Sequence, residues 1–410
     1  MISLEEAREF VLKGLTALAA QDVTLDQALG YATADDIVAC EQVPSFRNSS
    51  MDGFTFRAVD TVSGTTRLRI VDAVMAGHVS SMRLEPGEAM RIMTGAPLPE
   101  GADTVCKIED VTLEGDDVVV IPRPIELGDC VRQPGEDVTI GQVLVRAHRE
   151  LCAPAIAVLA GQGLSSVRVH RRPRVGVLST GDELALSNES LRPGQIRDLN
   201  RPLLLALLRE AGVTAVDFGV AADHHDEITQ LLRGAVSQCD AVITTGGVSV
   251  GDVDHVKLII GELSEGRARS MQVAIKPAKP FAFGLVGDDN TPVFGLPGNP
   301  VSTRVSFEAF VRPALRILGG HELIDRLHAL ATLDIALPTP KDTKTHFVHV
   351  GARVRGDGRI HVVEAARHHS HLMSSLVDCN AIAILVPGGS YGVGESANVI
   401  IVDADALGDS

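Results

Sequence analysis

Residues 241–252 read AVITTGGVSVGD, a short apolar run that passes directly into a glycine-rich turn. The run 241–244 is apolar up to Thr244, which is typical of a strand buried on both faces. Gly246 and Gly247 let the backbone approach a ligand closely, and successive amide N–H groups beside a helix start can hold phosphate. The turn is neither a Walker A loop nor a Rossmann loop. It predicts either an anion-binding loop or an ordinary strand-to-helix turn.

Strand-like and helical segments alternate around this turn from residue 173 to residue 320. The expected strands are 174–178, 213–220, 241–244 and 293–296, and the expected helices are 200–210, 225–238, 254–263 and 301–318. Asn200 is the expected cap of its helix. This rhythm predicts a mainly parallel sheet covered by helices on both faces, with ligands bound beyond the carboxyl ends of the strands.

Two further turns follow predicted strands, STGDE at 179–183 and GLPGNPVS at 295–302. Three such turns on one sheet edge favour ligand binding over three ordinary turns. The sequence KPAKP at 276–280 adds two lysines that each precede proline, which favours extended or polyproline backbone. With about three residues per turn, Lys276 and Lys279 would project from the same side. They are either a clamp for phosphate or another oxyanion, or a solvated surface pair.

Acidic residues in turns provide candidate Mg²⁺ ligands, since Mg²⁺ takes one or two carboxylates plus ligand oxygens. The candidates are Asp52, Glu136, Asp137, Glu183, Asp223 and Asp254. Each is, taken alone, more often a helix cap or turn residue than a metal ligand. The histidines at 368, 369 and 371 have no second His or Cys cluster, so solvated polar residues are favoured there over a metal site.

The remaining segments have a different character. Residues 3–20 predict an amphipathic helix capped by Ser3, residues 43–141 a β-rich unit, and residues 152–159 a helix. Residues 330–402 predict a small all-β domain. The expected fold class is therefore multidomain α/β plus β, with a central three-layer α/β domain, a β-rich domain and a C-terminal, barrel-like β-domain.

Composition excludes several classes of protein. Among 410 residues, 37 Lys and Arg oppose 53 Asp and Glu, giving a net charge of −16, and there is no Trp. This argues against nucleic-acid binding and anionic membranes. The six cysteines form no C-x-x-C pair, and neither a secretion signal nor a membrane-length apolar run is found, so we expect a cytoplasmic protein with reduced thiols. Net charge does not describe one pocket, so an anionic ligand remains open.

Motifs over nearly the whole chain resemble the MoeA family of molybdopterin molybdenumtransferases, which includes the E domain of gephyrin-type proteins. They are PSFRNSSMDG at 44–53, RIMTGAP at 91–97, GED at 135–137, the three strand-end turns, KPAKP at 276–280, and Ser370 with His371. The resemblance implies insertion of molybdate into adenylylated molybdopterin with release of AMP, assisted by Mg²⁺, as the last step of molybdenum cofactor assembly. It also implies a homodimer that meets the adenylyltransferase and cofactor-accepting enzymes.

The resemblance implies four domains and a set of site residues. The domains are 1–22 with 142–172 (I), the inserted 23–141 (II), 173–322 (III) and 328–410 (IV). The implied catalytic residues are Asp52, Thr94, Glu183, Asp254, Lys276 and Lys279, of which Glu183 and Asp254 would position Mg²⁺. The implied ligand-binding residues are Asp137, Asp223, Thr245, Gly246, Gly247, Ser249, Gly251, Pro297, Ser302, His349 and Ser370.

One residue departs from the family pattern. His349 stands where the family usually has Arg, and His is only partly charged near neutral pH. Molybdate affinity is then weakened, or another residue such as Arg353 substitutes, and we expect His349→Arg to lower the molybdate concentration needed for half-maximal activity. Two other functions stay open. The chain could be a non-catalytic cofactor carrier of the same fold, or an adenylyltransferase acting one step earlier.

Overall fold

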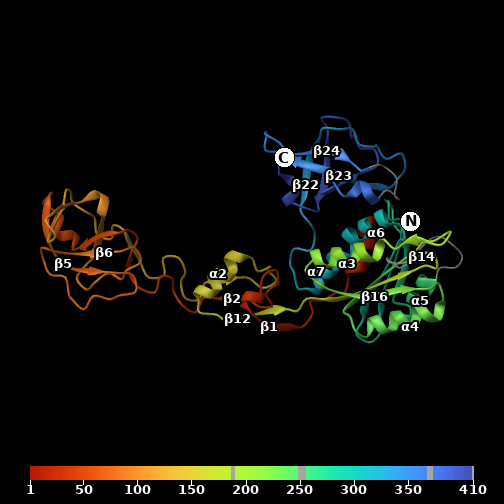
Figure 1. Cartoon of the computed structure of the whole chain (residues 1–410), viewed down its shortest axis with the longest axis horizontal. Coiled ribbons are helices and arrows are strands. Elements are labelled where there is room, and N and C mark those ends of the chain that lie inside the picture. Colours follow the sequence, from red (N-terminus) through yellow and green to blue (C-terminus); the bar gives the residue numbers. More distant parts are fainter. Residues whose placement is uncertain (186–189, 248–254, 367–372, 409–410) are drawn as a thin grey trace. The chain divides into compact units, whose positions relative to one another are not determined.

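A computed structural model of the chain describes residues 1–185, 190–247, 255–366 and 373–408 (Figure 1). The chain forms two compact units, each described here by itself. The larger contains residues 1–35, 147–152 and 166–410, and the smaller contains residues 36–146 and 153–165. Among the described helices, none combines the length and apolar character needed to cross a membrane.

The larger unit is built on a six-stranded sheet with the order β16-β13-β17-β21-β20-β18. Its first four strands are parallel: β16 (Thr214–Ala221), β13 (Arg174–Thr180), β17 (Ala241–Thr245) and β21 (Thr291–Leu296). The antiparallel strands β20 (Pro280–Val286) and β18 (Ala268–Gln272) complete it. The predicted mainly parallel sheet is confirmed, with an antiparallel edge that the pattern did not indicate.

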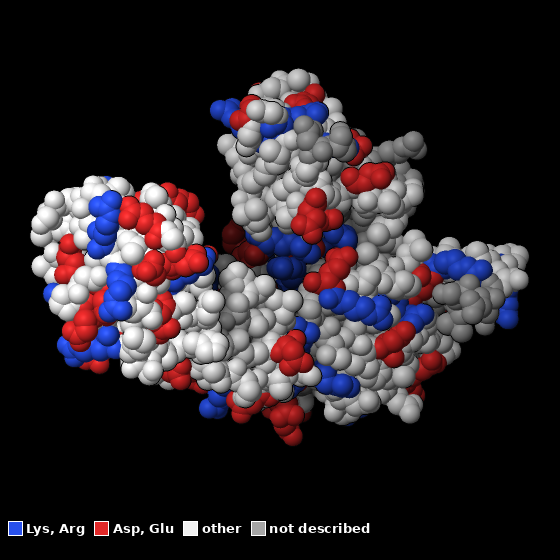
Figure 2. All heavy atoms as spheres, turned by 60° about the vertical axis from the view of Figure 1, so that its left-hand side comes forward, with Lys and Arg blue, Asp and Glu red and all other residues white. Residues whose placement is uncertain are grey.

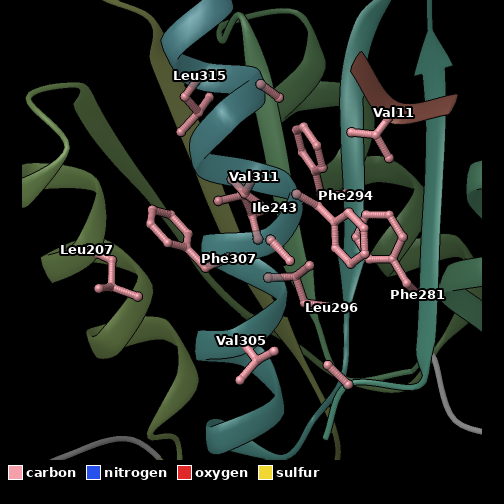
Figure 3. Packing of buried hydrophobic residues seen from close by; sticks show 14 of the residues in the cluster. Val11, Leu207, Ile243, Phe281, Phe294, Leu296, Val305, Phe307, Val311 and Leu315 are labelled. Carbon is pink, nitrogen blue, oxygen red and sulfur yellow. The ribbon is translucent and has the colours of Figure 1, made fainter. Parts of the chain in front are cut away.

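Helices cover both faces of this sheet (Figure 1). One face carries α3 (Asn200–Glu210), α6 (Pro300–Ser306) and α7 (Arg312–Leu318), and the other carries α4 (His225–Val236) and α5 (His255–Leu263). The expected helix 301–318 is interrupted by a π-helical turn, Phe307–Val311, between α6 and α7. Figure 3 shows Phe281 and Phe294 on the strands and Phe307 on the helical segment that packs over them, and all three are fully buried.

Residues 328–401 form a closed five-stranded barrel, as expected for a small β-domain. Its strands are β22 (His328–Leu333), β23 (Thr345–Val354), β24 (Ile360–Ala365), β25 (Ala381–Leu385) and β26 (Ser396–Ile401), and β23 closes the barrel by pairing with both β24 and β25. A short strand from the α/β domain, β19 (Ile275–Lys276), adds to β23 in parallel. Ile382 and Ile400 of the barrel belong to the same buried cluster as Phe281 and Phe307, so the two domains share a core.

The smaller unit contains its own six-stranded sheet in the order β7-β4-β6-β5-β9-β8. Its strands are β4 (Gly53–Phe56), β5 (Thr66–Val74), β6 (Glu88–Ile92), β7 (Thr104–Lys107), β8 (Thr112–Glu114) and β9 (Val118–Ile121). Phe54 and Phe56 are buried in its core. Also in this unit are helix α2 (Ala153–Gly161) and the pairs β2 (Ile37–Val38) with β11 (Val143–Val145) and β3 (Asn48–Ser49) with β10 (Val131–Arg132).

The N-terminal helix α1 spans Leu4–Leu12, so the expectation of a helix to residue 20 is wrong. Ser3 Oγ accepts a hydrogen bond from the Glu6 amide at 3.0 Å, as the predicted cap requires. The helix ends because Gly14 has a left-handed φ of 81°, after which the chain leads into β1 (Ala20–Thr24), paired with β12 (Ser166–His170). Leu15 and Leu18 still pack against the core, which explains their helix-like spacing.

Candidate active site

Three loops meet at one edge of the central sheet, because β13, β17 and β21 are adjacent and parallel. The prediction that these loops lie together is confirmed by their contacts. A Cβ atom built on Gly246 would lie 2.4 Å from the carbonyl oxygen of Thr180, at the end of β13. One built on Gly298 would lie 3.7 Å from Cα of Gly246. With a φ of 92°, Gly246 is a position that only glycine occupies without strain or collision.

Hydrogen bonds fix the third loop against the end of β17 and against α3. Thr245 Oγ1 and Thr303 Oγ1 donate to the carbonyl of Pro297 at 3.2 and 2.6 Å. Asn200 Nδ2 donates to the carbonyl of Gly298 at 2.7 Å. Asn200 therefore braces this loop and is not the predicted cap, since the Asp198 carboxylate accepts from the first amides of α3.

Three buried polar atoms at this edge have no hydrogen-bond partner among the residues that the structure describes. They are Ser179 Oγ, Thr180 Oγ1 and Asn200 Oδ1. Buried polar groups are nearly always paired in folded proteins, so unpaired ones grouped beside a glycine loop indicate a place for a polar ligand. The hydroxyls can donate to phosphate oxygens.

The acidic residues Glu183 and Asp223 lie beyond the ends of β13 and β16. The Glu183 carboxylate is folded back over Gly181, where an added Cβ would lie 2.5 Å from its oxygen. Asp182 Oδ1 accepts a hydrogen bond from the Asp223 amide at 2.9 Å. The structure thus brings Glu183 and Asp223 to the same edge as the glycine loops. The predicted residues Ser249, Gly251, Asp254 and Ser370 lie outside the described residues.

A cavity of about 930 Å³ lies between the α/β domain and the barrel, both in the larger unit. Lys276, Lys279, Ser302 and His349 line it, so the structure groups four of the predicted residues. The expected polyproline backbone is wrong: the Lys276–Pro277 bond is cis and Ala278 has a φ of 78°. Both lysines nevertheless reach one pocket, as expected for the clamp, and no carboxylate among the described residues lies within 4.0 Å of either.

The pocket wall is a sheet shared by two domains. Lys276 in β19 lies opposite His346 in β23, and the Thr345 amide donates to the carbonyl of Ala274 at 3.0 Å. The lysine segment is therefore held by main-chain bonds to the barrel. This pairing could not be read from the sequence, because two residues of β19 carry no strand pattern of their own.

His349 is almost completely buried, with 3% of its surface exposed. Burial, reinforced by the charge of Arg304, lowers the pKa of His349 to about 3. The expectation of a partly charged imidazole at neutral pH is therefore wrong, since this histidine is neutral. Arg353, suggested as a substitute, is not among the residues that line the cavity.

Sequence reasoning missed four ionisable residues of the pocket, namely Lys341, Asp342, Lys344 and His346. They follow Pro338 and Thr339 in the loop before β23 and at the start of that strand. In the sequence, this segment stands out only by its Pro, Thr and Lys residues. That composition does not indicate which surface the loop faces. Figure 2 shows Lys and Arg side chains gathered in a hollow of the surface.

In the smaller unit, Asp52 and Thr94 are in direct contact. Thr94 donates from its amide and its hydroxyl to Asp52 Oδ1, both at 2.7 Å, and these bonds lower the pKa of Asp52. Asp137 is exposed. The structure thus pairs two predicted residues of this unit. Within the described ranges, no three His, Cys, Asp or Glu side chains are grouped to hold a metal ion.

Comparisons with known proteins cover nearly the whole chain. Residues 2–163 match the family model "MoeA N-terminal region (domain I and II)", and residues 176–317 match "Probable molybdopterin binding domain". The chain is 34% identical to the molybdopterin molybdenumtransferase of Haemophilus influenzae over 97% of this chain and 98% of the relative. It is 32% identical to that of Staphylococcus aureus over 99% and 96%.

Solved structures show the same similarity. A molybdopterin biosynthesis MoeA protein of Pyrococcus horikoshii matches with a TM-score of 0.84 and 27% identity, covering 98% of this chain and all of that one. A second structure from this organism matches with a TM-score of 0.80 and 31% identity over the same shares. The likeness therefore extends over both units.

Proposed function

Since the chain belongs to the MoeA family of molybdopterin molybdenumtransferases, we propose that it inserts molybdate into adenylylated molybdopterin and releases AMP, the last step of molybdenum cofactor assembly. The observation that carries this proposal is the cavity of about 930 Å³ that joins Lys276, Lys279 and Ser302. Its volume is that of a site for an organic ligand, and its lysines attract an oxyanion.

The edge of the sheet is suited to the phosphate groups of the nucleotide. The loop around Gly246 approaches Thr180 too closely to admit a side chain, and the Ser179 and Thr180 hydroxyls are buried without partners among the described residues. Backbone amides and hydroxyls aimed at one place bind phosphate without the flexibility of long side chains. In this proposal they hold the diphosphate, while Lys276 and Lys279 attract molybdate and stabilise the developing charge.

Mg²⁺ fits the chemistry of this edge, because Glu183 and Asp223 supply the oxygen ligands that Mg²⁺ prefers. The neighbouring hydroxyls of Ser179 and Thr180 are unpaired among the described residues and can donate to a phosphate. We propose that Glu183, with Asp254, positions the ion. When bound, it would offset negative charge on the anhydride that is cleaved. The protein's part is to orient the carboxylates, and Gly181 does so by leaving room for Glu183.

The smaller unit enters the proposal through the family's homodimer. In the family pattern the second domain faces the third domain of the partner, so Asp52, Thr94 and Asp137 would complete the partner's site. The short bonds from Thr94 to Asp52 keep that carboxylate ionised, as a residue that contacts a metal or a proton donor requires. We propose the cytoplasm as the place of action.

A cofactor carrier without turnover is the second candidate, and neutral His349 is the observation that favours it. An assay for AMP distinguishes the two. Purified protein mixed with adenylylated molybdopterin, Mg²⁺ and molybdate should release AMP, and tight binding without release would support the carrier. Formation of the adenylylated pterin from ATP would instead support the adenylyltransferase.

Lys276→Ala sharpens this test. Removing one preorganised charge from a transition-state site lowers kcat by about 10²–10³. Lys13→Ala is the matched control, because Lys13 is an exposed lysine of the same unit that does not line the cavity. Wild-type turnover in Lys276→Ala would remove that residue from the site. Molybdate and tungstate compared side by side would identify the preferred metal oxyanion.

A further inference from the structure

The barrel contributes its own cationic group to the cavity. Lys341 and Lys344 line it from the loop before β23. Lys276 and Lys279 line it from a different segment, in the α/β domain. Among the described lining residues, the four lysines face a single carboxylate, Asp342. Counting the four lysines and the one aspartate, the lining has a net charge of +3, whereas the whole chain carries −16. A local reversal of sign of this size indicates a site for an anion.

If Lys276 and Lys279 bind one tetrahedral oxyanion, that ion does not also need Lys341 and Lys344. A cavity of about 930 Å³ is also much larger than such an ion, and pockets of this volume hold drug-sized ligands. The second pair of lysines therefore has both the space and the charge to receive a second anionic group. His349, being neutral, does not provide that charge.

Asp342 is placed to neutralise Lys344. Lys344 Nζ lies 3.8 Å from Asp342 Oδ2, and the Lys344 amide donates to Asp342 Oδ1 at 3.1 Å. His346 Nε2 lies 2.9 Å from the same Oδ1, and this hydrogen bond is the largest contribution that lowers the pKa of Asp342. Lys341 has no carboxylate within 4.0 Å among the described residues and is available to a ligand.

We propose that Lys341 and Lys344 form a second subsite for a tetrahedral oxyanion or phosphate group, and that the ligand replaces Asp342 as the counter-ion of Lys344. The inference rests on the proposed function for the identity of the anion. The subsite takes either free molybdate or a phosphate of the pterin nucleotide, and both present the same tetrahedral array of charged oxygens. Lys344 lies one residue before β23, which binds β19, so the two lysine pairs keep a fixed relation.

Direct binding tests the subsite without requiring turnover. Isothermal titration of the full-length protein with molybdate, and separately with inorganic phosphate, should give dissociation constants about tenfold higher for Lys341→Gln or Lys344→Gln with at least one of the two ions. Lys13→Gln is the control for loss of one lysine charge. Unchanged constants for both ions in both pocket variants would overturn the inference.

Asp342→Asn separates a binding role from a structural one. Asparagine keeps an oxygen that accepts from the Lys344 amide and from His346, but removes the negative charge. The subsite predicts tighter anion binding in Asp342→Asn, by about threefold, and weaker binding in Lys344→Gln. If the ion pair between Lys344 and Asp342 only stabilised the loop, both variants would bind the anion more weakly. That result would contradict the proposal.

Steady-state kinetics identify the source of the anion. A raised KM for molybdate in Lys341→Gln and Lys344→Gln assigns the subsite to the free oxyanion, and a raised KM for the adenylylated pterin assigns it to the phosphate. Wild-type KM values for both would overturn the subsite but leave the proposed function intact. Absence of AMP release by the wild type, with anion binding weakened in the variants, would refute the function and leave the subsite.

Discussion

Position 349 holds a polar side chain that is almost completely buried. The imidazole is 3% exposed, and Nε2 has no hydrogen-bond partner among the described residues. Ala366 donates its amide to the carbonyl of His349 at 2.9 Å, which holds the backbone in β23. The charge that adds to burial in lowering its pKa is that of Arg304 in α6, and the cavity that His349 lines carries Lys276, Lys279 and Lys344 as well as one carboxylate, Asp342. Both burial and these surroundings disfavour the imidazolium.

This burial predicts a pH dependence of stability. An ordinary His has a pKa near 6.5 in the unfolded chain, and the folded value is about 3. The unfolded state therefore binds the extra proton below pH 6.5, so the contribution of His349 is fully present above that pH and is lost as the pH falls toward 3. By pH 5 the loss amounts to about 2 kcal/mol.

Urea unfolding of wild type and His349→Gln at pH 7 and pH 5 measures this loss. The variant should lose about 2 kcal/mol less between the two pH values than the wild type. His321, whose pKa is lowered to about 4 by burial, is present in both proteins and cancels from the comparison. An equal loss in the two proteins would show that His349 is charged when folded.

Replacement of His349 by arginine is expected to lower the molybdate concentration for half-maximal activity. An arginine adds a permanent charge and a planar fork suited to an oxyanion, and residue 349 lines the cavity into which a longer side chain can extend. His349→Gln, neutral like the buried histidine, should change that concentration by less than about twofold. An unchanged or raised molybdate requirement in the arginine variant would refute this account.

Among the elements, strand-end loops were predictable from sequence because their cause is local. A continuous apolar run followed by Gly246 and Gly247 specifies both a buried strand and a turn that only glycine permits. The same locality misled the prediction at the N-terminus, where Leu15 and Leu18 keep helical spacing beyond Gly14. The spacing of apolar residues indicates which side chains pack inward, but Gly14 determines where the helical backbone ends.

Other parts of the site could not be predicted because distant segments create them. Lys341 and Lys344 become site residues only when the barrel packs beside 276–280, more than 60 residues earlier. Asparagine is a residue type that often caps helices, yet the side-chain amide of Asn200 donates to the carbonyl of Gly298. The loop around Ala278 takes a left-handed φ that the alternating prolines did not indicate.

Gly246→Ala tests how closely the loops must approach. Alanine at a φ of 92° is strained, and its Cβ would collide with the Thr180 carbonyl at 2.4 Å, so either β13 or the loop must shift. We expect a loss of about 3 kcal/mol or more in unfolding free energy and a fall in AMP release of about 100-fold or more.

Gly212→Ala is the matched control for Gly246→Ala. Gly212 also has a left-handed φ, 72°, but nothing lies within 4 Å of the added Cβ. This variant should cost only about 1–2 kcal/mol and keep normal turnover. Equal effects in the two variants would mean that the positive φ, and not the contact between loops, explains the need for glycine.

At the scale of the whole molecule, the hydrophobic clusters predict which parts open together. Ile382 lies in the barrel but is buried in the same cluster as Ile243 and Phe307 of the α/β domain. Phe54 belongs to a cluster of the smaller unit. Large-to-small substitutions at such sites cost about 2–5 kcal/mol through lost burial and the remaining cavity. Their effects should therefore follow the clusters and not the order of the chain.

Hydrogen exchange resolved by segment tests this prediction. Ile382→Ala should speed exchange in both β17 and β23, since the two domains share one core, and leave β5 and β6 unchanged. Phe54→Ala should do the reverse, and Leu330→Ala, at a position 67% exposed in the barrel, should do neither. An effect of Ile382→Ala confined to β23 would mean that the barrel opens alone. In that case the shared β19–β23 pairing would not hold the two lysine pairs in a fixed relation, and each wall of the cavity would bind its anion independently.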